Sequence, residues 1–159
     1  ASLYRIFYYD AMPFEGEVAN PMDGYSQNYK LTAQAKANRG LIDGLEQEAD
    51  FAVRRGTLLR QGWKIRTKSL NEITRTQRGV VAKDLVPDFK QKGVDIRIGL
   101  DMAQIALNRL VDILVLVTGD SDFVPVMKFA RTQGLKVYLE TLGRSIRPEM
   151  RAHCDCVLS

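Results

Sequence analysis

The sequence predicts an α/β fold with a mostly parallel sheet, and two observations support this. Apolar strand-like runs alternate with helical patterns over most of the 159 residues, as expected for parallel strands joined by helical crossovers. An apolar run over 111–117 is followed by Thr118-Gly119-Asp120-Ser121-Asp122-Phe123 and then by a helical pattern. A strand that ends in aspartate and turns into a helix places charge at the carboxyl edge of the sheet, where such folds bind ligands.

The first elements are a strand, a long loop and a helix. The apolar and aromatic residues of 4–9 predict a short strand. Residues 11–29 contain two glycines, two prolines and little periodicity, which predicts a long loop. The composition and apolar spacing of 31–52 predict one helix with an interruption near Gly40 or Gly44.

The next segment, 51–83, is predicted to form a basic ribbon or insertion. Strict alternation over 63–68 indicates a strand, and 51–69 as a whole predicts a two-stranded ribbon with one basic face. Residues 71–90 are polar and weakly patterned, which predicts a loop with a short strand around 79–82. The basic residues expected to share one strand face are Lys64, Arg66 and Lys68.

The second half shows the clearest alternation of elements. Pro125 fits the first turn of a helix, and Gly134 suits the residue just after the end of that helix. The predicted elements are a helix over 97–110, a strand over 112–118, a helix over 122–133, a strand over 135–142, a helix over 146–152 and a last strand over 156–158.

Length and composition indicate one soluble globular domain, 1–159. Hydrophobic residues make up 45% and charged residues 26%, which are ordinary values for such proteins. No apolar run approaches the roughly 20 residues of a membrane span, and the first residues lack the layout of a signal peptide. We therefore expect a cytoplasmic protein without a membrane partner, in which Cys154 and Cys156 stay reduced.

The charge of the chain is unevenly distributed. Residues 51–83 contain nine basic side chains and one acid, Glu72, so this segment carries +8 while the rest of the chain carries −4. Such an asymmetry is typical of a phosphate-facing patch beside an acidic centre. Lysine and arginine that protect an exposed strand edge would give the same pattern, so both interpretations stay open.

Several aspartates are placed where they can converge. Asp10 and Asp120 each follow a strand, Asp122 lies two residues further on, and Asp101 lies on the polar stripe of a predicted helix. Three of them have an alternative structural role: Asp10 in a turn, Asp122 as a helix cap, and Asp101 in a pair with Arg97. Asp120 is harder to explain in this way, because it ends a very apolar strand, where an unpaired charge is costly. Together, carboxylates on separate elements suit a magnesium-type site, because that ion prefers oxygen ligands.

Motifs for other chemistries are missing from the sequence. The chain has no Walker or dinucleotide glycine pattern and no recognisable serine or cysteine nucleophile motif. Its single histidine, His153, stands apart from the acids near the C-terminus. General-base catalysis by histidine is therefore not expected.

A family resemblance rests on four stretches of the chain. These are Asp10 after the first strand, Lys92-Gly93-Val94-Asp95, Leu100-Asp101-Met102, and 118–123 followed by Pro125. In this combination the chain resembles the NYN domain, LabA-like branch, of the PIN-like nuclease superfamily. The resemblance runs from about Tyr4 to Leu158, although Ala11-Met12-Pro13 departs from the glycine that commonly follows the first aspartate.

The resemblance implies a PIN-like three-layer α/β/α sandwich with a mostly parallel central sheet and a metal-dependent endoribonuclease site. The implied cofactor is Mg²⁺ or Mn²⁺ and the implied partner is RNA, either single-stranded or structured. The catalytic and metal-binding residues implied are Asp10, Asp101, Asp120 and Asp122, with Asp95 as a further candidate ligand. Candidate RNA-binding residues, from the charge pattern and from the family motifs, are Lys64, Arg66, Lys68, Lys92 and Ser121.

Two alternatives to an active nuclease remain. One is a catalytically inactive RNA-binding or regulatory module that retains the acidic pocket. The other is a phosphoacceptor signalling domain, which is disfavoured because Asp10 has no acidic neighbour. Candidate aromatics for base stacking are Trp63, Tyr25 and Tyr29. Formation of a homo-oligomer is left open.

Overall fold

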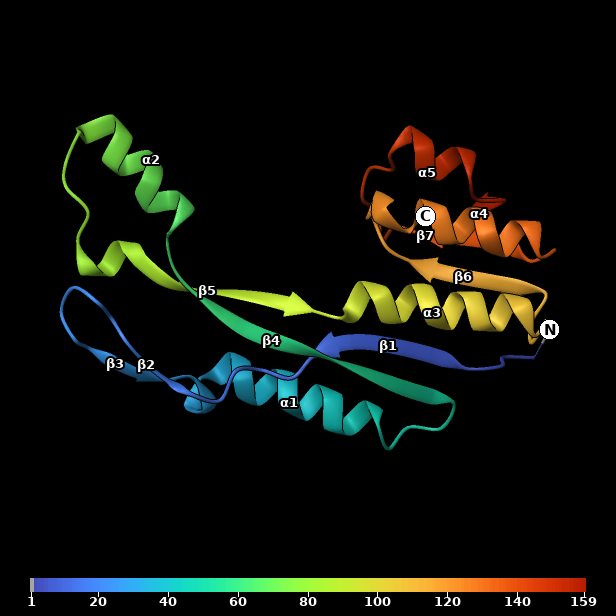
Figure 1. Cartoon of the computed structure of the whole chain (residues 1–159), viewed down its shortest axis with the longest axis horizontal. Helices are drawn as coiled ribbons and strands as arrows, with labels where there is room; N and C mark the ends of the chain where they lie inside the picture. Colours follow the sequence, from blue (N-terminus) through green and yellow to red (C-terminus); the bar gives the residue numbers. More distant parts are fainter. Residues whose placement is uncertain (1) are drawn as a thin grey trace. The chain divides into compact units, whose positions relative to one another are not determined.

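The computed structural model describes residues 2–159, which form an α/β fold with mainly parallel strand pairing (Figure 1). The chain divides into two compact units. The N-terminal unit is Arg5–Val94, and the C-terminal unit is Asp95–Ser159 with the first residues up to Tyr4. The predicted α/β class with mostly parallel strands is confirmed. None of the helices in residues 2–159 is long and apolar enough to cross a membrane.

The N-terminal unit is built on a three-stranded sheet of order β1-β4-β5. Strand β1 (Ile6–Ala11) pairs in parallel with β4 (Phe51–Ile65), and β4 pairs in antiparallel with β5 (Leu85–Lys92). Asp10 lies within β1, opposite Arg55. Because β1 and β4 are parallel, the chain between them must cross from one end of the sheet to the other, and this crossover contains α1.

Helix α1 (Ala33–Leu45) contacts β4 and begins at a well-defined cap (Figure 1). The Thr32 hydroxyl accepts a hydrogen bond from Ala35 N at 3.2 Å, which satisfies a backbone donor of the first turn. The predicted helix over 31–52 was too long at its C-terminal end. Gly40 and Gly44 are both inside the helix, and Phe51 and Ala52 already belong to β4.

The connection from β1 to α1 is more ordered than the predicted loop over 11–29. It contains a short antiparallel hairpin of β2 (Glu17–Ala19) and β3 (Ser26–Asn28), followed by the 3-10 turn η1 (Tyr29–Leu31). The Asn20 side chain donates to Ala82 O at 2.9 Å. This bond ties the hairpin to a segment 62 residues further along the chain.

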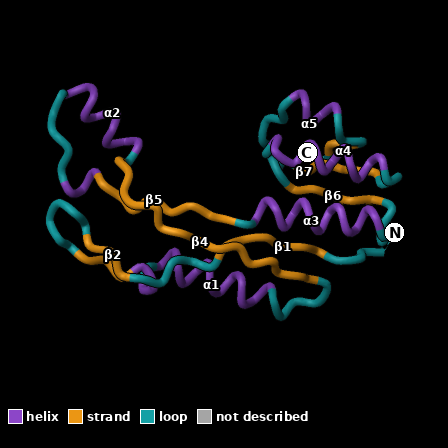
Figure 2. The backbone as a smooth tube through the Cα atoms, viewed as in Figure 1, coloured by secondary structure: helices purple, strands orange, loops and turns teal. Residues whose placement is uncertain are grey.

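The basic segment 51–83 differs from the prediction. Residues 51–65 form one strand, whose partner is β5, and Figure 2 shows the two strands running together. A register shift between Arg60 and Trp63, where Gly62 has a φ of 119°, bends the ribbon. The strand ends at Ile65 and α2 (Thr67–Thr76) follows. Lys64, Arg66 and Lys68 therefore do not share a strand face, since Arg66 occupies the position just before α2, without a side-chain capping bond, and Lys68 lies inside the helix.

The polar segment after β4 is a helix and a turn held by a buried ion pair. Asp84, in the 3-10 turn η2 (Ala82–Asp84), is 1% exposed and accepts two hydrogen bonds from Arg78, at 2.6 and 2.9 Å. It also accepts one from Val81 N at 2.9 Å. The Arg78 side chain holds the pKa of Asp84 well below its usual range. The predicted loop and short strand around 79–82 are therefore wrong.

A glycine permits a close approach next to β1. A Cβ added to Gly56 would lie 2.6 Å from Val94 Cγ2 and 2.9 Å from Lys92 O. Gly56 pairs with Ala11, the residue after Asp10. Gly93 follows with a φ of 78°, and α3 starts at Val94. The Lys92-Gly93-Val94-Asp95 motif thus forms the turn from β5 into α3.

The C-terminal unit has a parallel sheet of order β6-β7-β8. Observed boundaries lie within a few residues of those predicted, and Pro125 does lie in the first turn of α4. Gly134 follows α4 with a φ of 95°. The elements are α3 (Val94–Leu107), β6 (Ile113–Val117), the 3-10 turn η3 (Ser121–Phe123), α4 (Val124–Thr132), β7 (Lys136–Glu140), α5 (Pro148–Ala152) and β8 (Cys156–Val157).

The core of this unit lies between the sheet and its helices. Helix α4 packs on β7, and both contribute side chains that are fully buried. Cys154 and Cys156 are half-buried free thiols, as expected. The fully buried large side chains here are Met127, Val137, Leu139 and Met150. This core fixes the carboxyl ends of β6 and β7, where the candidate acids lie.

Candidate functional site

Asp120 lies in the turn that joins β6 to α4. Its carboxylate accepts a hydrogen bond from Asp122 N at 3.0 Å, and its own N donates to Thr118 Oγ1 at 3.1 Å. Asp120 rather than Asp122 is therefore the cap of the turn that starts the helix. Both carboxylates are exposed. The turn orients the Asp120 carboxylate while leaving it accessible to a ligand.

The acids on α3 occupy two different environments. Asp95 is exposed in the first turn, where a negative charge is favoured by the helix dipole. Asp101 lies six residues further along the helix and is half-buried. These positions suit a structural role for Asp95 and leave Asp101 as the better candidate ligand.

A further acid, Glu140, ends β7 beside the end of β6. Val117 is paired with Glu140 in the sheet, and Thr118 N donates to Glu140 O at 3.1 Å. The Glu140 carboxylate accepts from the Ser159 hydroxyl and from Leu142 N. Both hydrogen bonds lower the pKa of Glu140. Glu140 is therefore held in a structural role next to the Asp120 turn.

An arginine lies beside the same turn. Arg147 Nη1 donates to Ser121 Oγ at 2.9 Å. Its nearest acidic partner, Glu149, is 4.0 Å away, and the Arg147 side chain is largely exposed. A guanidinium in this position can bind a phosphate next to Asp120. Ser121 was predicted from the sequence as an RNA-binding residue, whereas Arg147 was not.

In the N-terminal unit, Asp10 is half-buried and hydrogen-bonded. Gln91 Nε2 donates to Asp10 Oδ1 at 3.0 Å, and the Tyr8 hydroxyl donates to Oδ2 at 3.3 Å. Burial raises the pKa of Tyr8, and the negative charge of Asp10 adds to this shift. The Asp10 carboxylate thus accepts from neutral donors, with no cation bound to it in an ion pair among residues 2–159.

A cavity of about 360 Å³ opens beside Asp10, and we call it the Asp10 cavity. All residues that line it belong to the N-terminal unit. Its main side chains, besides Asp10, are Phe14, Tyr29, Phe89, Gln34, Asn38 and Gln91. Of the three aromatics predicted to stack on bases, only Tyr29 lines this cavity.

The donor types fit a hard divalent cation, because all predicted ligands are carboxylates. Within either unit, no three side chains of His, Cys, Asp or Glu in residues 2–159 are grouped closely enough to hold a metal ion. Asp10 belongs to one unit, and Asp101, Asp120 and Asp122 belong to the other. A shared carboxylate site therefore stays a prediction.

The candidate RNA-binding cations are all exposed, but they differ in their partners. Lys64 Nζ lies 2.8 Å from Asp88 Oδ1, so much of its charge is neutralised locally. Arg66 has no ion pair within residues 2–159, and its charge acts on the Tyr29 phenol in the Asp10 cavity. Lys68 and Lys92 are exposed on α2 and at the end of β5.

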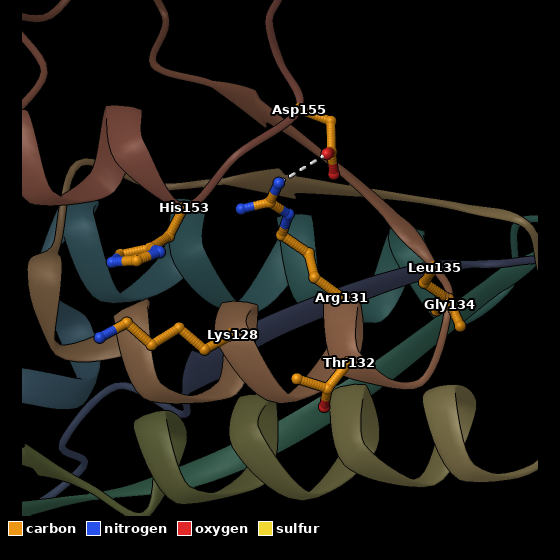
Figure 3. A pocket seen from close by; sticks show the side chains of 7 residues that line it. All are labelled: Lys128, Arg131, Thr132, Gly134, Leu135, His153 and Asp155. Carbon is orange, nitrogen blue, oxygen red and sulfur yellow. Dashed lines mark ion pairs between the residues drawn. The ribbon is translucent and has the colours of Figure 1, made fainter.

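A larger cavity, of about 520 Å³, lies away from the predicted acids (Figure 3). It forms beside the C-terminal half of α4, near the amino end of β7, whereas Asp120 follows the carboxyl end of β6. Arg131 Nη2 lies 3.0 Å from Asp155 Oδ1, and Lys128 and His153 lie together on one side. It contains none of the residues predicted from the sequence.

Comparison with known proteins identifies the family. Neither the curated proteins nor the solved structures give a significant match to this chain. The family model of the NYN domain matches residues 27–159, which is most of the chain and includes Asp101, Asp120 and Asp122. Asp10 precedes the matched segment. The mainly parallel α/β architecture agrees with the PIN-like fold expected of this family. The chain belongs to the NYN domain family.

Proposed function

We propose that the chain is a metal-dependent endoribonuclease of the LabA-like branch, with residues 1–159 acting as one catalytic domain. The observation that carries this proposal is the Asp120–Asp122 turn at the carboxyl end of β6, within the segment that matches the NYN family. Two accessible carboxylates at that edge of a parallel sheet are suited to ligand binding. The substrate is RNA, single-stranded or locally structured.

The proposed ligands of Mg²⁺ or Mn²⁺ are Asp10, Asp101, Asp120 and Asp122, with Asp95 as a further candidate. When bound, such an ion lowers the pKa of a water molecule and stabilises charge on a phosphate. Hydrogen bonds from neighbouring groups orient two of these carboxylates. The Asp122 N–H orients the Asp120 carboxylate, and Gln91 orients that of Asp10.

Phosphate binding is assigned to cations near these acids. Arg147, held by Ser121, lies beside the Asp120 turn, and Arg66 lies near the Asp10 cavity. Lys92 and Lys68 add exposed positive charge to the N-terminal unit. Such contacts bind the RNA backbone without selecting its sequence.

The test is cleavage of a labelled single-stranded RNA with Mn²⁺, with Mg²⁺ and with EDTA. We expect cleavage with either ion and none with EDTA. Asp120→Asn should reduce the rate at least about 100-fold, because even outer-shell partners of a metal cost about 10- to 100-fold. The matched control is Asp112→Asn, an exposed aspartate just before the amino end of β6, which should cleave normally. Equal rates for the Asp120 variant and wild type would refute the proposal.

A second candidate is a non-catalytic RNA-binding module. The observation that favours it is that both Asp10 carboxylate oxygens already accept hydrogen bonds from neutral donors. A protein of this kind would bind RNA with EDTA present and would show no metal-dependent cleavage. The same assay, combined with a binding measurement, separates the two candidates.

A further inference from the structure

The Asp10 cavity has an aromatic wall. The ring centroids of Phe14 and Phe89 are 5.0 Å apart, those of Tyr29 and Phe89 are 5.2 Å apart, and those of Phe14 and Tyr29 are 6.1 Å apart. All three residues are half-buried, so each ring keeps some surface accessible. Aromatic rings at the edge of a cavity are the usual platform for an unpaired base.

Amide side chains line the same cavity. Gln34 and Asn38 lie four residues apart on α1, so their side chains are on one face of the helix. Neither amide makes a hydrogen bond with any other part of residues 2–159. Gln91 contributes a third amide, which donates to Asp10. Amides can both donate to and accept from the edge of a base.

The cavity is held in shape by bonds of the two residues that follow Phe14, Glu15 and Gly16. Glu15 pairs with Arg39 of α1 and lies 3.8 Å from Lys30. On the next residue, Gly16 O accepts a hydrogen bond from Tyr29 N at 3.1 Å. These contacts fix the segment that carries Phe14 against the helix that carries the amides. A site formed before binding loses less entropy when its ligand arrives.

Charge and size select the class of ligand. Burial raises the pKa of Tyr29, so its phenol stays neutral and can donate a hydrogen bond, while Arg66 supplies positive charge nearby. A volume of about 360 Å³ is at the small end of ligand sites, which suits one base and excludes a duplex. An aromatic wall, unpartnered amides and an adjacent cation together match a nucleotide of a single strand.

We propose that the Asp10 cavity binds one unpaired base of the RNA, next to the phosphate that is cleaved. This inference rests on the proposed function for its RNA ligand. The base stacks on the aromatic wall, its edge is hydrogen-bonded by Gln34 and Asn38, and Arg66 binds an adjoining phosphate. The departure from the family pattern at Ala11-Met12-Pro13 leads directly into Phe14, which forms part of the wall.

The first experiment measures binding of single-stranded RNAs that each lack one base. The full chain carrying Asp120→Asn is used with Mg²⁺, so that the RNA stays intact. We expect one position at which base removal weakens binding between about fivefold and 100-fold, as for a lost stacking contact. Uniformly small effects at all positions, or no RNA binding, would overturn the proposal.

Amide substitutions identify the cavity as the place where that base binds. Adding Gln34→Ala and Asn38→Ala should weaken binding of intact RNA but not of the RNA that lacks the critical base. Gln47→Ala, an exposed amide beyond the end of α1, is the matched control and should change neither affinity. Equal losses for both RNAs in the double variant would show that the amides do not contact the base.

A cross-linking experiment avoids any effect of substitution on folding. 4-Thiouridine at the critical position should cross-link to peptides that contain Phe14, Tyr29 or Phe89, and cross-links confined to other segments would contradict the proposal. Cleavage by the wild-type chain is measured alongside. If base removal weakens binding but no RNA is cleaved, base binding in the Asp10 cavity is supported and the nuclease function is rejected. If RNA is cleaved but base removal has no effect, the nuclease function is supported and base binding in the cavity is rejected.

Discussion

The two compact units of this chain present different chemistry because their sheets are built differently. The C-terminal unit has short parallel strands, and two of its candidate acids, Asp120 and Asp122, lie in the turn that follows one of them. The N-terminal unit has a 15-residue strand in a bent ribbon, with cations, aromatic rings and a cavity that is open to one side. In the function that we propose, the C-terminal unit supplies most of the metal ligands, and the N-terminal unit supplies most of the contacts to RNA.

The largest effect that we expect comes from the buried ion pair of the N-terminal unit. Asp84→Asn removes the negative charge of a buried carboxylate that pairs with Arg78. The variant loses the charge-assisted bonds at a buried position and leaves Glu72 as the acidic partner of Arg78, so we expect the Tm to fall by about 5 °C or more at pH 7. Glu140→Gln, at the end of β7, is the comparison in the C-terminal unit and should cost less, because Glu140 has no ion-pair partner in residues 2–159.

The loss in Tm caused by Asp84→Asn should depend on pH, and the direction follows from the sign of the pKa shift of Asp84. The pKa of Asp84 is lower in the folded chain than in the unfolded chain, so the unfolded chain takes up a proton first. The stabilisation is complete above the ordinary pKa of about 4 and is lost as the pH falls through the lowered value. The gap in Tm between wild type and Asp84→Asn should therefore narrow progressively as the pH falls below about 4. A constant gap in Tm down to pH 2 would contradict this assignment.

A second comparison uses two glycines of the N-terminal unit. Gly56→Ala places a methyl group against Lys92 O and Val94, and we expect a loss of about 1–3 kcal/mol in the free energy of unfolding. Gly40→Ala in α1 meets no atom within 4 Å and should stabilise the helix by up to about 1 kcal/mol. Urea unfolding of both variants gives the two values. Equal changes would show that the close approach at Gly56 does not matter.

The smallest expected effect separates the cations of the ribbon. Arg66→Gln should lower the salt slope of single-stranded RNA binding by about 0.7, the value for one lost phosphate contact. Lys64→Gln should lower it less, because Lys64 already pairs with Asp88. The salt slope of each variant is obtained from RNA affinities measured at several salt concentrations. If both variants kept the wild-type slope, the basic segment would have a structural role instead.

The sequence predicted the C-terminal unit well and the N-terminal unit poorly, for physical reasons. Short parallel strands have continuous apolar runs, and their helices have clear periodicity, so 112–118 and 97–110 were placed within a few residues. Residues 67–76 contain only two apolar side chains, Leu70 and Ile73, so their helical spacing is easily overlooked. The turn after α2 is stabilised by the pair of Arg78 and Asp84. That pair cannot be recognised from local preference.

The candidate site shows the same contrast. The Asp120 turn could be predicted because strand, acids and helix are contiguous in the sequence. The Asp10 cavity could not, because Phe14, Asn38 and Phe89 come from separate segments that meet only in the folded chain. Aromatic residues that come from separate segments have no regular spacing in the sequence, so no sequence pattern identifies them. Arg147 was missed for the same reason, since Ser121 lies 26 residues away.

The most direct test of the central claim is an anomalous-scattering experiment on crystals soaked in Mn²⁺. We predict an Mn²⁺ peak within about 2.6 Å of an Asp120 carboxylate oxygen, shared with at least one of Asp10, Asp101 and Asp122. Crystals of Asp120→Asn should lose that peak, and crystals of Asp112→Asn should keep it. An Mn²⁺ ion bound only at other residues, or no ion at saturating concentration, would contradict the account.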